Sequence, residues 1–242
     1  MIDLSGKRAF VTGGGRGIGR ATALLLARAG AKVAVGYRSR KPAAEPHITA
    51  AVRGDLGTTA GATKAVGEAL RALGGKLDIL VINHGVWPSD DVPVAKMTDE
   101  QWESTRRANL DAVIYVCRAA IPEITEGGTI VLVGSTAGQR GEAFHTDYAA
   151  TKGAVISMTK SLAVELAPKI TVNCVAPGWV DTEMSAKPYA GGGRERIEQS
   201  IPLRRVASAD DVAGPILFLC SPLARHITGE VLNVNGGSVL CG

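Results

Sequence analysis

The sequence predicts a single α/β domain with a doubly wound, mostly parallel sheet covered by helices on both faces. Short apolar runs alternate with longer helical patterns along all 242 residues, which is typical of repeated βαβ units. Aromatic residues make up only 4%, so the core depends on Ala, Val, Ile and Leu, as in a parallel sheet buried on both faces. No linker divides the chain, and we expect residues 1–242 to form one three-layer α/β/α domain.

Seven short apolar runs are the expected strands. They span residues 9–11, 33–35, 48–52, 79–82, 130–133, 170–175 and 231–234. The clearest helical patterns span residues 18–29, 98–120 and 146–166. Gly30 is typical of a helix C-terminus and Thr98 of an N-cap. Residues 181–205, with three consecutive glycines, interrupt the alternation and are either a cover over a site or a surface insertion.

Composition argues against several classes of protein. The net charge of +4 is mild and no block of five like charges occurs, so we expect no nucleic-acid partner. No apolar stretch reaches the roughly 18 residues of a membrane span, and the N-terminus lacks the apolar region of a signal peptide. The four cysteines form no C-x-x-C pair and the histidines form no cluster, so we expect reduced thiols and no metal site. We therefore expect a cytoplasmic protein without a membrane partner.

A glycine-rich loop joins the first predicted strand to the first predicted helix. Residues 12–19 read T-G-G-G-R-G-I-G, with glycines spaced as G-x-x-x-G-x-G. Glycines let the backbone approach a pyrophosphate, and a helix N-terminus offers free N–H groups and a partial positive charge. This order of strand, loop and helix predicts a dinucleotide site. The residues expected to contact the cofactor here are Gly13, Arg16, Gly17, Ile18 and Gly19.

Tyr148 and Lys152 are four residues apart in the longest predicted helix, so their side chains share one face. Carbonyl reduction needs a proton donor, and a free tyrosine, with a pKa of about 10, is a sluggish one at neutral pH. A lysine ammonium beside the phenol and the positive nicotinamide of an oxidised cofactor are both expected to lower the pKa of the phenol. Ser135 ends the fifth predicted strand, where its hydroxyl can hydrogen-bond a substrate oxygen. Taken singly, Tyr148 and Lys152 could belong to a solvated helix face, and Ser135 could be a turn serine. Together the three residues indicate a catalytic group.

These motifs resemble those of the short-chain dehydrogenase/reductase family along nearly the whole chain. The glycine spacing matches the family fingerprint, and Ser135 precedes Tyr148 by the family's 13 residues. The resemblance implies a Rossmann-type fold with Ser135, Tyr148 and Lys152 at the reaction centre. It also implies that Asn109 bends its helix and holds a water linked to Lys152, which would bind the nicotinamide ribose as well. A buried asparagine satisfied locally is the alternative for Asn109.

The resemblance assigns further residues to the cofactor. Asp55 and Leu56 match a pair that contacts adenine, although an aspartate capping the next turn is the alternative for Asp55. Asn83 and Gly85 match the turn that passes under the cofactor ribose. The motif P-G-x-x-x-T is implied to hold the nicotinamide carboxamide, and its residues here are Pro177, Gly178, Val180 and Thr182.

The end of the second predicted strand bears on the choice between NAD and NADP. It offers Arg38 and Ser39 and no carboxylate, whereas an NAD enzyme usually carries Asp or Glu there for the ribose 2′-hydroxyl. A cation suits the 2′-phosphate of NADP, and Arg16 points to the same corner in proteins of this family. We therefore expect NADP(H) to be favoured over NAD(H), with solvated surface arginines as the alternative.

The sequence departs from the family pattern in three places. Residues 82–85 read I-N-H-G where the family has N-N-A-G, and for His84 a packing or orienting role is favoured over that of a catalytic base. His145, three residues before the catalytic tyrosine, either lines the substrate pocket or lies on the surface. The stretch between Arg38 and Asp55 is short and holds two prolines, so we expect the usual helix to be absent.

The expected function is an NADP(H)-dependent oxidoreductase that transfers a hydride between the nicotinamide and a small carbonyl compound or secondary alcohol. Residues 201–205 (I-P-L-R-R) and the C-terminal segment look most like the 3-oxoacyl-acyl-carrier-protein reductase branch. Family members usually form tetramers or dimers, so we expect a homo-oligomer. Two alternatives stay open: an NAD-dependent dehydrogenase of a sugar, polyol or cyclic alcohol, and a non-catalytic NADP(H) sensor or scaffold.

Overall fold

The computed structural model describes residues 2–241, which form one seven-stranded sheet in the order β3-β2-β1-β4-β5-β6-β7. Every neighbouring pair of strands is parallel. The strands are β1 (Arg8–Thr12), β2 (Lys32–Tyr37), β3 (Ile48–Arg53), β4 (Leu77–Ile82), β5 (Ile124–Val133), β6 (Ile170–Pro177) and β7 (Val231–Val234). β1 lies inside the sheet, with β2 and β3 on one side and β4 to β7 on the other, so the sheet is doubly wound as predicted.

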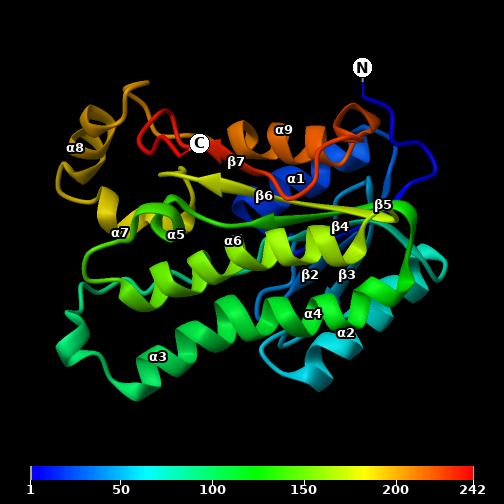
Figure 1. The fold of residues 1–242 in the computed structure, drawn as a ribbon, viewed down its shortest axis with the longest axis horizontal. Coiled ribbons are helices and arrows are strands. Elements are labelled where there is room, and N and C mark those ends of the chain that lie inside the picture. Colours follow the sequence, from blue (N-terminus) through cyan, green and yellow to red (C-terminus); the bar gives the residue numbers. More distant parts are fainter. Residues whose placement is uncertain (1, 242) are drawn as a thin grey trace.

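Helices cover both faces of this sheet (Figure 1). The helices are α1 (Gly17–Arg28), α2 (Thr59–Leu73), α3 (Asp99–Arg106), α4 (Ala112–Ala120), α5 (Thr136–Arg140), α6 (Thr146–Leu166), α7 (Ala186–Tyr189), α8 (Gly193–Ser200) and α9 (Ala209–Leu219). α1 and α9 pack on one face, and α2, α4 and α6 pack on the other. The three-layer α/β/α architecture expected from the sequence is therefore confirmed.

Alternate residues of the inner strands face the two helical layers. Phe10 and Leu80 pack toward α2, α4 and α6, whereas Val11 and Val81 pack toward α1 and α9. All residues of β4 are buried. A strand buried on both faces has no polar side, which explains why these strands read as continuous apolar runs.

The seven strands predicted from the sequence are all present, and most extend slightly beyond the predicted residues. Thr98 does cap α3, because its hydroxyl oxygen accepts a hydrogen bond from the Gln101 N–H at 3.2 Å. The sequence analysis misses α2 and α9. α2 buries a stripe made mainly of alanines, and α9 contains Pro215, so neither carries the strong apolar periodicity of a helix of large residues.

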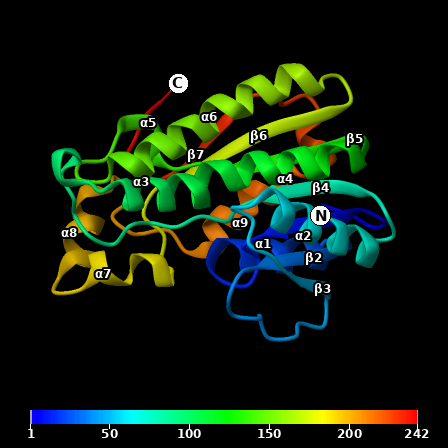
Figure 2. The same ribbon diagram turned by 90° about the horizontal axis from the view of Figure 1, so that it is seen from below.

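The two irregular segments noted in the sequence behave differently. The chain between β2 and β3 has no helix, as expected from its length and prolines, and runs as a long loop (Figure 2). Residues 181–205 carry a short 3-10 helix (Glu183–Ser185), α7 and α8. These lie at the end of the molecule to which the β6 and β7 arrows point (Figure 1). That end is where ligands bind in doubly wound sheets.

Asp78 forms a largely buried ion pair at the opposite, amino ends of the strands. Its carboxylate accepts hydrogen bonds from the Arg8 N–H at 2.9 Å, the Arg8 Nε at 2.8 Å and the Thr125 hydroxyl at 2.8 Å. Burial raises the pKa of the Asp78 carboxyl, but the hydrogen bonds from Arg8 and Thr125 outweigh burial and lower it. One carboxylate thus joins β1, β4 and β5.

We expect Asp78→Ala to lower the free energy of unfolding by about 2–4 kcal/mol, because it leaves the Arg8 guanidinium and the Thr125 hydroxyl without their partner. Urea unfolding near neutral pH measures this loss. Because folding lowers the carboxyl pKa, its contribution is present above the unfolded pKa of about 4 and fades as the pH falls through the folded pKa. The control Glu123→Ala removes an exposed pair with Lys76 and should lose at most about 1 kcal/mol. Equal losses in the two variants would contradict this assignment.

Candidate active site

A pocket opens at the carboxyl ends of the strands and brings together residues from distant parts of the sequence. Ser135, Tyr148 and Gly178 line it, so two of the predicted catalytic residues and one predicted cofactor residue share one cavity. The remaining side chains include three that the sequence analysis did not select, Arg140, Glu142 and Met184. Trp87 and Trp179 supply apolar walls. Arg140 and Glu142 lie close to Ser135 in the sequence, and this is the only signal that could have pointed to them.

Ser135 and Tyr148 are placed by the starts of two helices. Ser135 follows β5 and caps α5, where its hydroxyl oxygen accepts a hydrogen bond from the Ala137 N–H at 3.1 Å. Tyr148 lies in the first turn of α6 and is 9% exposed. Burial raises the pKa of the Tyr148 phenol, and the hydrogen bond with Ser135 lowers it by less. Among the groups of this chain, loss of water outweighs the hydrogen bond and raises the pKa of the phenol, and the lowering expected beside an oxidised nicotinamide stays a prediction.

Lys152 lies one turn along α6 and is buried among backbone. Its Nζ donates a hydrogen bond to the Val133 carbonyl at 2.8 Å and lies 5.8 Å from the centre of the Tyr148 ring. Burial lowers the pKa of the Lys152 ammonium to about 8. Two glycines make room: a Cβ on Gly138 would collide with the Lys152 backbone, and one on Gly85 would lie 3.5 Å from Nζ. The geometry therefore brings the predicted phenol and ammonium onto one face beside the pocket.

Asn109 is fully buried in a π-helical turn, Arg107–Asp111, between α3 and α4. Its Oδ1 accepts a hydrogen bond from the Val86 N–H at 2.7 Å, and its Nδ2 donates to the Val86 carbonyl at 2.9 Å. A single π-helical turn inside a helix is frequent at functional sites. The side chain thus fixes the loop after β4 against the helix that bends beside Lys152.

The glycine loop has the close approaches expected of a phosphate cradle. Gly13 and Gly17 have positive φ of 63° and 50°, which favours glycine. A Cβ on Gly19 would collide with the Gly13 carbonyl. The α1 N-cap makes no side-chain hydrogen bond, so the first N–H groups of α1 carry no cap. Asn83 supports the loop, because its Nδ2 donates to the Thr12 and Gly13 carbonyls at 3.3 Å.

The residues predicted to bind the adenosine half are at the protein surface. Arg38 and Ser39 are exposed just after β2. Asp55 accepts a hydrogen bond from Arg107 at 2.5 Å and so is already paired. The Arg16 guanidinium bonds Glu183 at 2.6 Å instead of lying free toward Arg38. Two apolar residues predicted to contact the cofactor are partly buried. Ile18 of the glycine loop packs on the α1 side of the sheet, and Leu56 packs on the α2 side.

The residues predicted to hold the nicotinamide follow β6. Pro177 ends that strand, and the Gly178 N–H donates to the Val234 carbonyl at 3.1 Å. The Val180 carbonyl accepts a hydrogen bond from the Ser185 hydroxyl at 2.7 Å. Thr182 reaches the glycine loop, because a Cβ on Gly17 would lie 3.2 Å from its Cγ2. The two halves of the predicted cofactor site therefore meet between the glycine loop and the segment after β6.

His84 contacts the same loop. Its Nδ1 lies 2.8 Å from the Thr12 hydroxyl oxygen, while its buried Nε2 has no hydrogen-bond partner among residues 2–241. Burial, and then the charge of Lys152, lower the pKa of His84 to about 3. An imidazole with this pKa is a poor proton acceptor at neutral pH, which favours the orienting role over the catalytic base. Thr12, the first residue of the glycine motif, is the partner that the sequence analysis overlooked.

Comparison with known proteins now places the chain in a family. A family model described as "Enoyl-(Acyl carrier protein) reductase" matches residues 13–238. The chain belongs to the short-chain dehydrogenase/reductase family and is an oxidoreductase of that family. It is 37% identical to the 3-oxoacyl-(acyl-carrier-protein) reductase FabG of Escherichia coli over 244 residues, covering 98% of both chains. It is 38% identical to the same reductase of Aquifex aeolicus over 248 residues, again covering 98% of each.

Solved structures agree with this placement. A short-chain dehydrogenase/reductase from Brucella melitensis, described as a glucose/ribitol dehydrogenase, has a TM-score of 0.93 with 34% identity, covering 99% of both chains. A short chain dehydrogenase from Burkholderia cenocepacia in complex with NADP has a TM-score of 0.88 with 36% identity, covering 97% of this chain and 98% of the other.

Two searches for other kinds of site complete the description. Across residues 2–241, none of the helices combines the length and the apolar character needed to cross a membrane. Within the same described residues, no group of three or more His, Cys, Asp or Glu side chains is arranged to hold a metal ion.

The lowered pKa of Lys152 makes a prediction about stability against pH. Because folding lowers this pKa from 10.5 to about 8, the folded state binds fewer protons than the unfolded state between those values, and stability contributed at this site rises with pH there. Relative to Lys152→Met, the wild type should gain about 3 kcal/mol of unfolding free energy across this window. Urea unfolding at pH values of about 7 and about 10 measures the difference. The matched control is Lys160→Met, an exposed lysine of the same helix, which should run parallel to wild type. A Lys152→Met curve that also runs parallel would contradict the burial of the charge.

Proposed function

We propose that the protein is an NADP(H)-dependent reductase of small carbonyl compounds, acting most like a 3-oxoacyl-acyl-carrier-protein reductase. The observation that carries this proposal is the pocket in which the Tyr148 phenol lies beside Ser135, with the Lys152 Nζ 5.8 Å from the centre of the phenol ring. Burial raises the pKa of this phenol. A phenol that stays protonated at neutral pH is a proton donor, which is what carbonyl reduction requires.

Support for a bound nicotinamide dinucleotide comes from residues of this chain. The uncapped α1 N-terminus and the positive-φ glycines Gly13 and Gly17 fit a pyrophosphate. The unpartnered Nε2 of His84 lies in the loop that adjoins them, where a cofactor hydroxyl would satisfy it. Arg38, exposed at the end of β2 without a neighbouring carboxylate in residues 37–41, suits a 2′-phosphate. NADP is bound in the Burkholderia relative, which agrees with this assignment.

Each residue of the site then has a separate task. The reduced nicotinamide supplies the hydride. Ser135 donates a hydrogen bond to the substrate oxygen and stabilises the charge that develops there. Tyr148 protonates that oxygen, and the Lys152 ammonium stabilises the phenolate left behind. Asn109 holds the Val86 backbone and so keeps the loop after β4 beside the lysine.

Substrate class, assembly and compartment are further parts of the proposal. The relatives named as 3-oxoacyl-(acyl-carrier-protein) reductases favour a 3-oxoacyl compound, and the Brucella neighbour keeps a sugar or polyol in view as the second candidate. Exposed apolar residues such as Val164, which is 82% exposed on α6, support a homo-oligomer, either a tetramer or a dimer. All four cysteines are free thiols, which supports the cytoplasm.

The test of the reaction is a panel of 3-oxoacyl esters, simple ketones, aldoses and polyols, monitored by nicotinamide absorbance with each cofactor. Tyr148→Phe should lower kcat by about 10²–10⁴-fold, because it removes the proton donor. The Tyr148→Phe variant should bind NADPH as the wild type does, because the substitution keeps the aromatic ring of the side chain. Tyr115→Phe makes the same change on α4, outside the pocket, and is the matched control. Undiminished turnover by Tyr148→Phe would overturn the proposed chemistry.

The cofactor preference has its own test at Arg38. Arg38→Asp should weaken NADPH binding by about 10–100-fold, since a charge-assisted hydrogen bond to phosphate contributes about 1.5–3 kcal/mol. NADH binding should hold or improve, because a carboxylate suits the free 2′-hydroxyl. Titration of both cofactors by fluorescence measures the two dissociation constants. Arg28→Asp, on the far end of α1, is the control for a general charge effect. If both Arg38→Asp and the control weaken the two cofactors equally, the assignment of Arg38 fails.

A further inference from the structure

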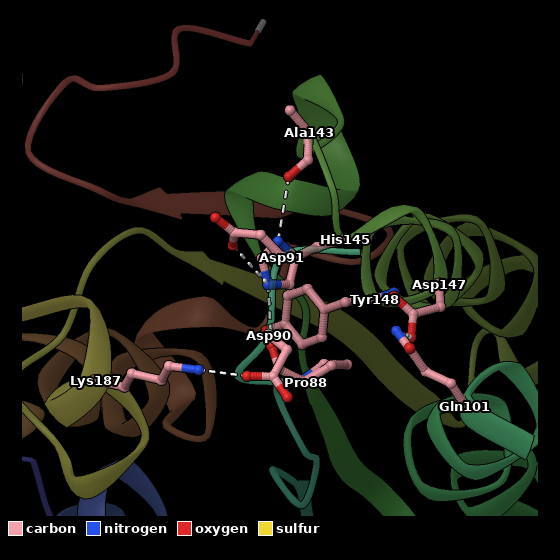
Figure 3. Close-up of polar contacts among 9 residues, drawn as sticks. All are labelled: Pro88, Asp90, Asp91, Gln101, Ala143, His145, Asp147, Tyr148 and Lys187. Carbon is pink, nitrogen blue, oxygen red and sulfur yellow. Dashed lines mark hydrogen bonds and ion pairs between the residues drawn. The ribbon is translucent and has the colours of Figure 1, made fainter. Parts of the chain in front are cut away.

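His145 is buried directly behind the pocket rather than in it or on the surface. It is 5% exposed and immediately precedes α6, three residues before Tyr148. Its two ring nitrogens face backbone carbonyls of two different loops: Nε2 lies 2.9 Å from the Pro88 oxygen and Nδ1 lies 3.2 Å from the Ala143 oxygen (Figure 3). One imidazole therefore joins the loop after β4 to the loop before α6.

The ring of His145 also supports a wall of the pocket. It stacks on Trp87 with ring centres 4.0 Å apart and an angle of 18°. Trp87 in turn meets the Tyr148 ring edge-on, with centres 4.6 Å apart. Trp179 lies 6.4 Å from Trp87 on the same wall. The position of the indole beside the phenol thus depends on the imidazole behind it.

The backbone around His145 is strained, which indicates that this arrangement is held in place. Phe144 has a φ of 65°, which is unusual for a bulky residue, and its carbonyl accepts a hydrogen bond from the Val92 N–H at 3.1 Å. Such strain persists only where surrounding contacts over-determine it. The bonds to Pro88 and Val92 supply those contacts and tie the same two loops together twice.

Charged groups surround the arrangement on the solvent side. Asp91 Oδ1 lies 3.8 Å from His145 Nε2, and neighbouring Asp90 bonds Lys187 of α7 (Figure 3). On the inner side, the Asp147 carboxylate is already used by the Tyr148 N–H and the Thr105 hydroxyl. The loop of Asp90 and Asp91 therefore contacts both His145 and the segment after β6, through two different carboxylates.

We propose that His145 is a positioning residue for the carbonyl-reducing reaction, and that it sets substrate specificity by clamping Trp87 against Tyr148. The imidazole acts through a hydrogen bond to one of the two carbonyls that it faces and through its stacked face, and it does not touch the reacting atoms. Its effect is therefore on how the substrate is held beside Ser135 and Tyr148. The expected change in KM rests on the proposed function, whereas the expected change in hydrogen exchange does not.

Three variants separate the parts of the clamp. His145→Ala removes the polar contacts of the ring with the two carbonyls and the stacked face, His145→Phe keeps an aromatic ring, and His145→Gln keeps a donor toward the Pro88 carbonyl. The exposed His226→Gln is the matched control. We expect His145→Ala to raise KM for the best carbonyl of the panel by about tenfold, with kcat and the NADPH dissociation constant changed by less than about threefold. His145→Phe and His145→Gln should each recover part of the loss.

A second measurement does not depend on turnover. Hydrogen exchange of the segment around Val92, whose N–H bonds the Phe144 carbonyl, should accelerate in His145→Ala and stay unchanged in His226→Gln. Normal exchange together with an unchanged KM in His145→Ala overturns the clamp while leaving the proposed function intact. A wild type that reduces no carbonyl removes the proposed function, and the exchange result then decides the clamp alone. Loss of NADPH binding in step with KM also overturns it, because the effect would then be general.

Discussion

The structure at the strand ends depends on keeping a phenol and an ammonium buried side by side on the first turns of α6. Burial disfavours the charged form of Lys152 and the ionised form of Tyr148, so both need a fixed surrounding. Of the three N–H groups of Lys152, one bonds the Val133 carbonyl, which leaves two for a ligand. The glycine at position 138 allows the backbone to come close enough for this, because a Cβ there would collide with the Lys152 backbone.

Buried hydrogen bonds surround this pair on one side, and exposed ion pairs surround it on the other. Toward the interior, Asp147 accepts the Tyr148 N–H and the Thr105 hydroxyl, and Asn109 takes both polar groups of the Val86 backbone. These are buried hydrogen bonds, and losing any one of them leaves a group unsatisfied. Toward solvent, the segment after β6 is held by exposed ion pairs such as Arg16 with Glu183, each contributing about 0–1 kcal/mol. The same segment is also held from inside by the buried hydrogen bond from the Ser185 hydroxyl to the Val180 carbonyl.

The sequence predicts those parts of the molecule in which a single physical requirement selects a single type of residue. Buried strands read as apolar runs, and the glycine loop reads as a close backbone approach. What the sequence does not provide is the partner of a polar side chain. The burial that raises the Tyr148 pKa, the use of Arg16 by Glu183 and the place of His145 behind the pocket depend on loops that fold back from far along the chain. The short helices α7 and α8 and the alanine-rich α2 escape notice because their apolar stripes are weak or brief.

The protonation states of the reaction centre also bear on the direction of the reaction. Tyr148 keeps its proton well above neutral pH, because burial raises its pKa, whereas Lys152 loses its proton at a pKa of about 8. Near neutral pH the phenol can give a proton and the ammonium can compensate the phenolate, which serves reduction. Oxidation of an alcohol needs the phenolate at the start, and that state becomes accessible only as the pH rises or as a positive nicotinamide ring offsets the cost of burial. The burial that fixes the geometry therefore also keeps the Tyr148 phenol protonated at neutral pH, in the form that can donate a proton.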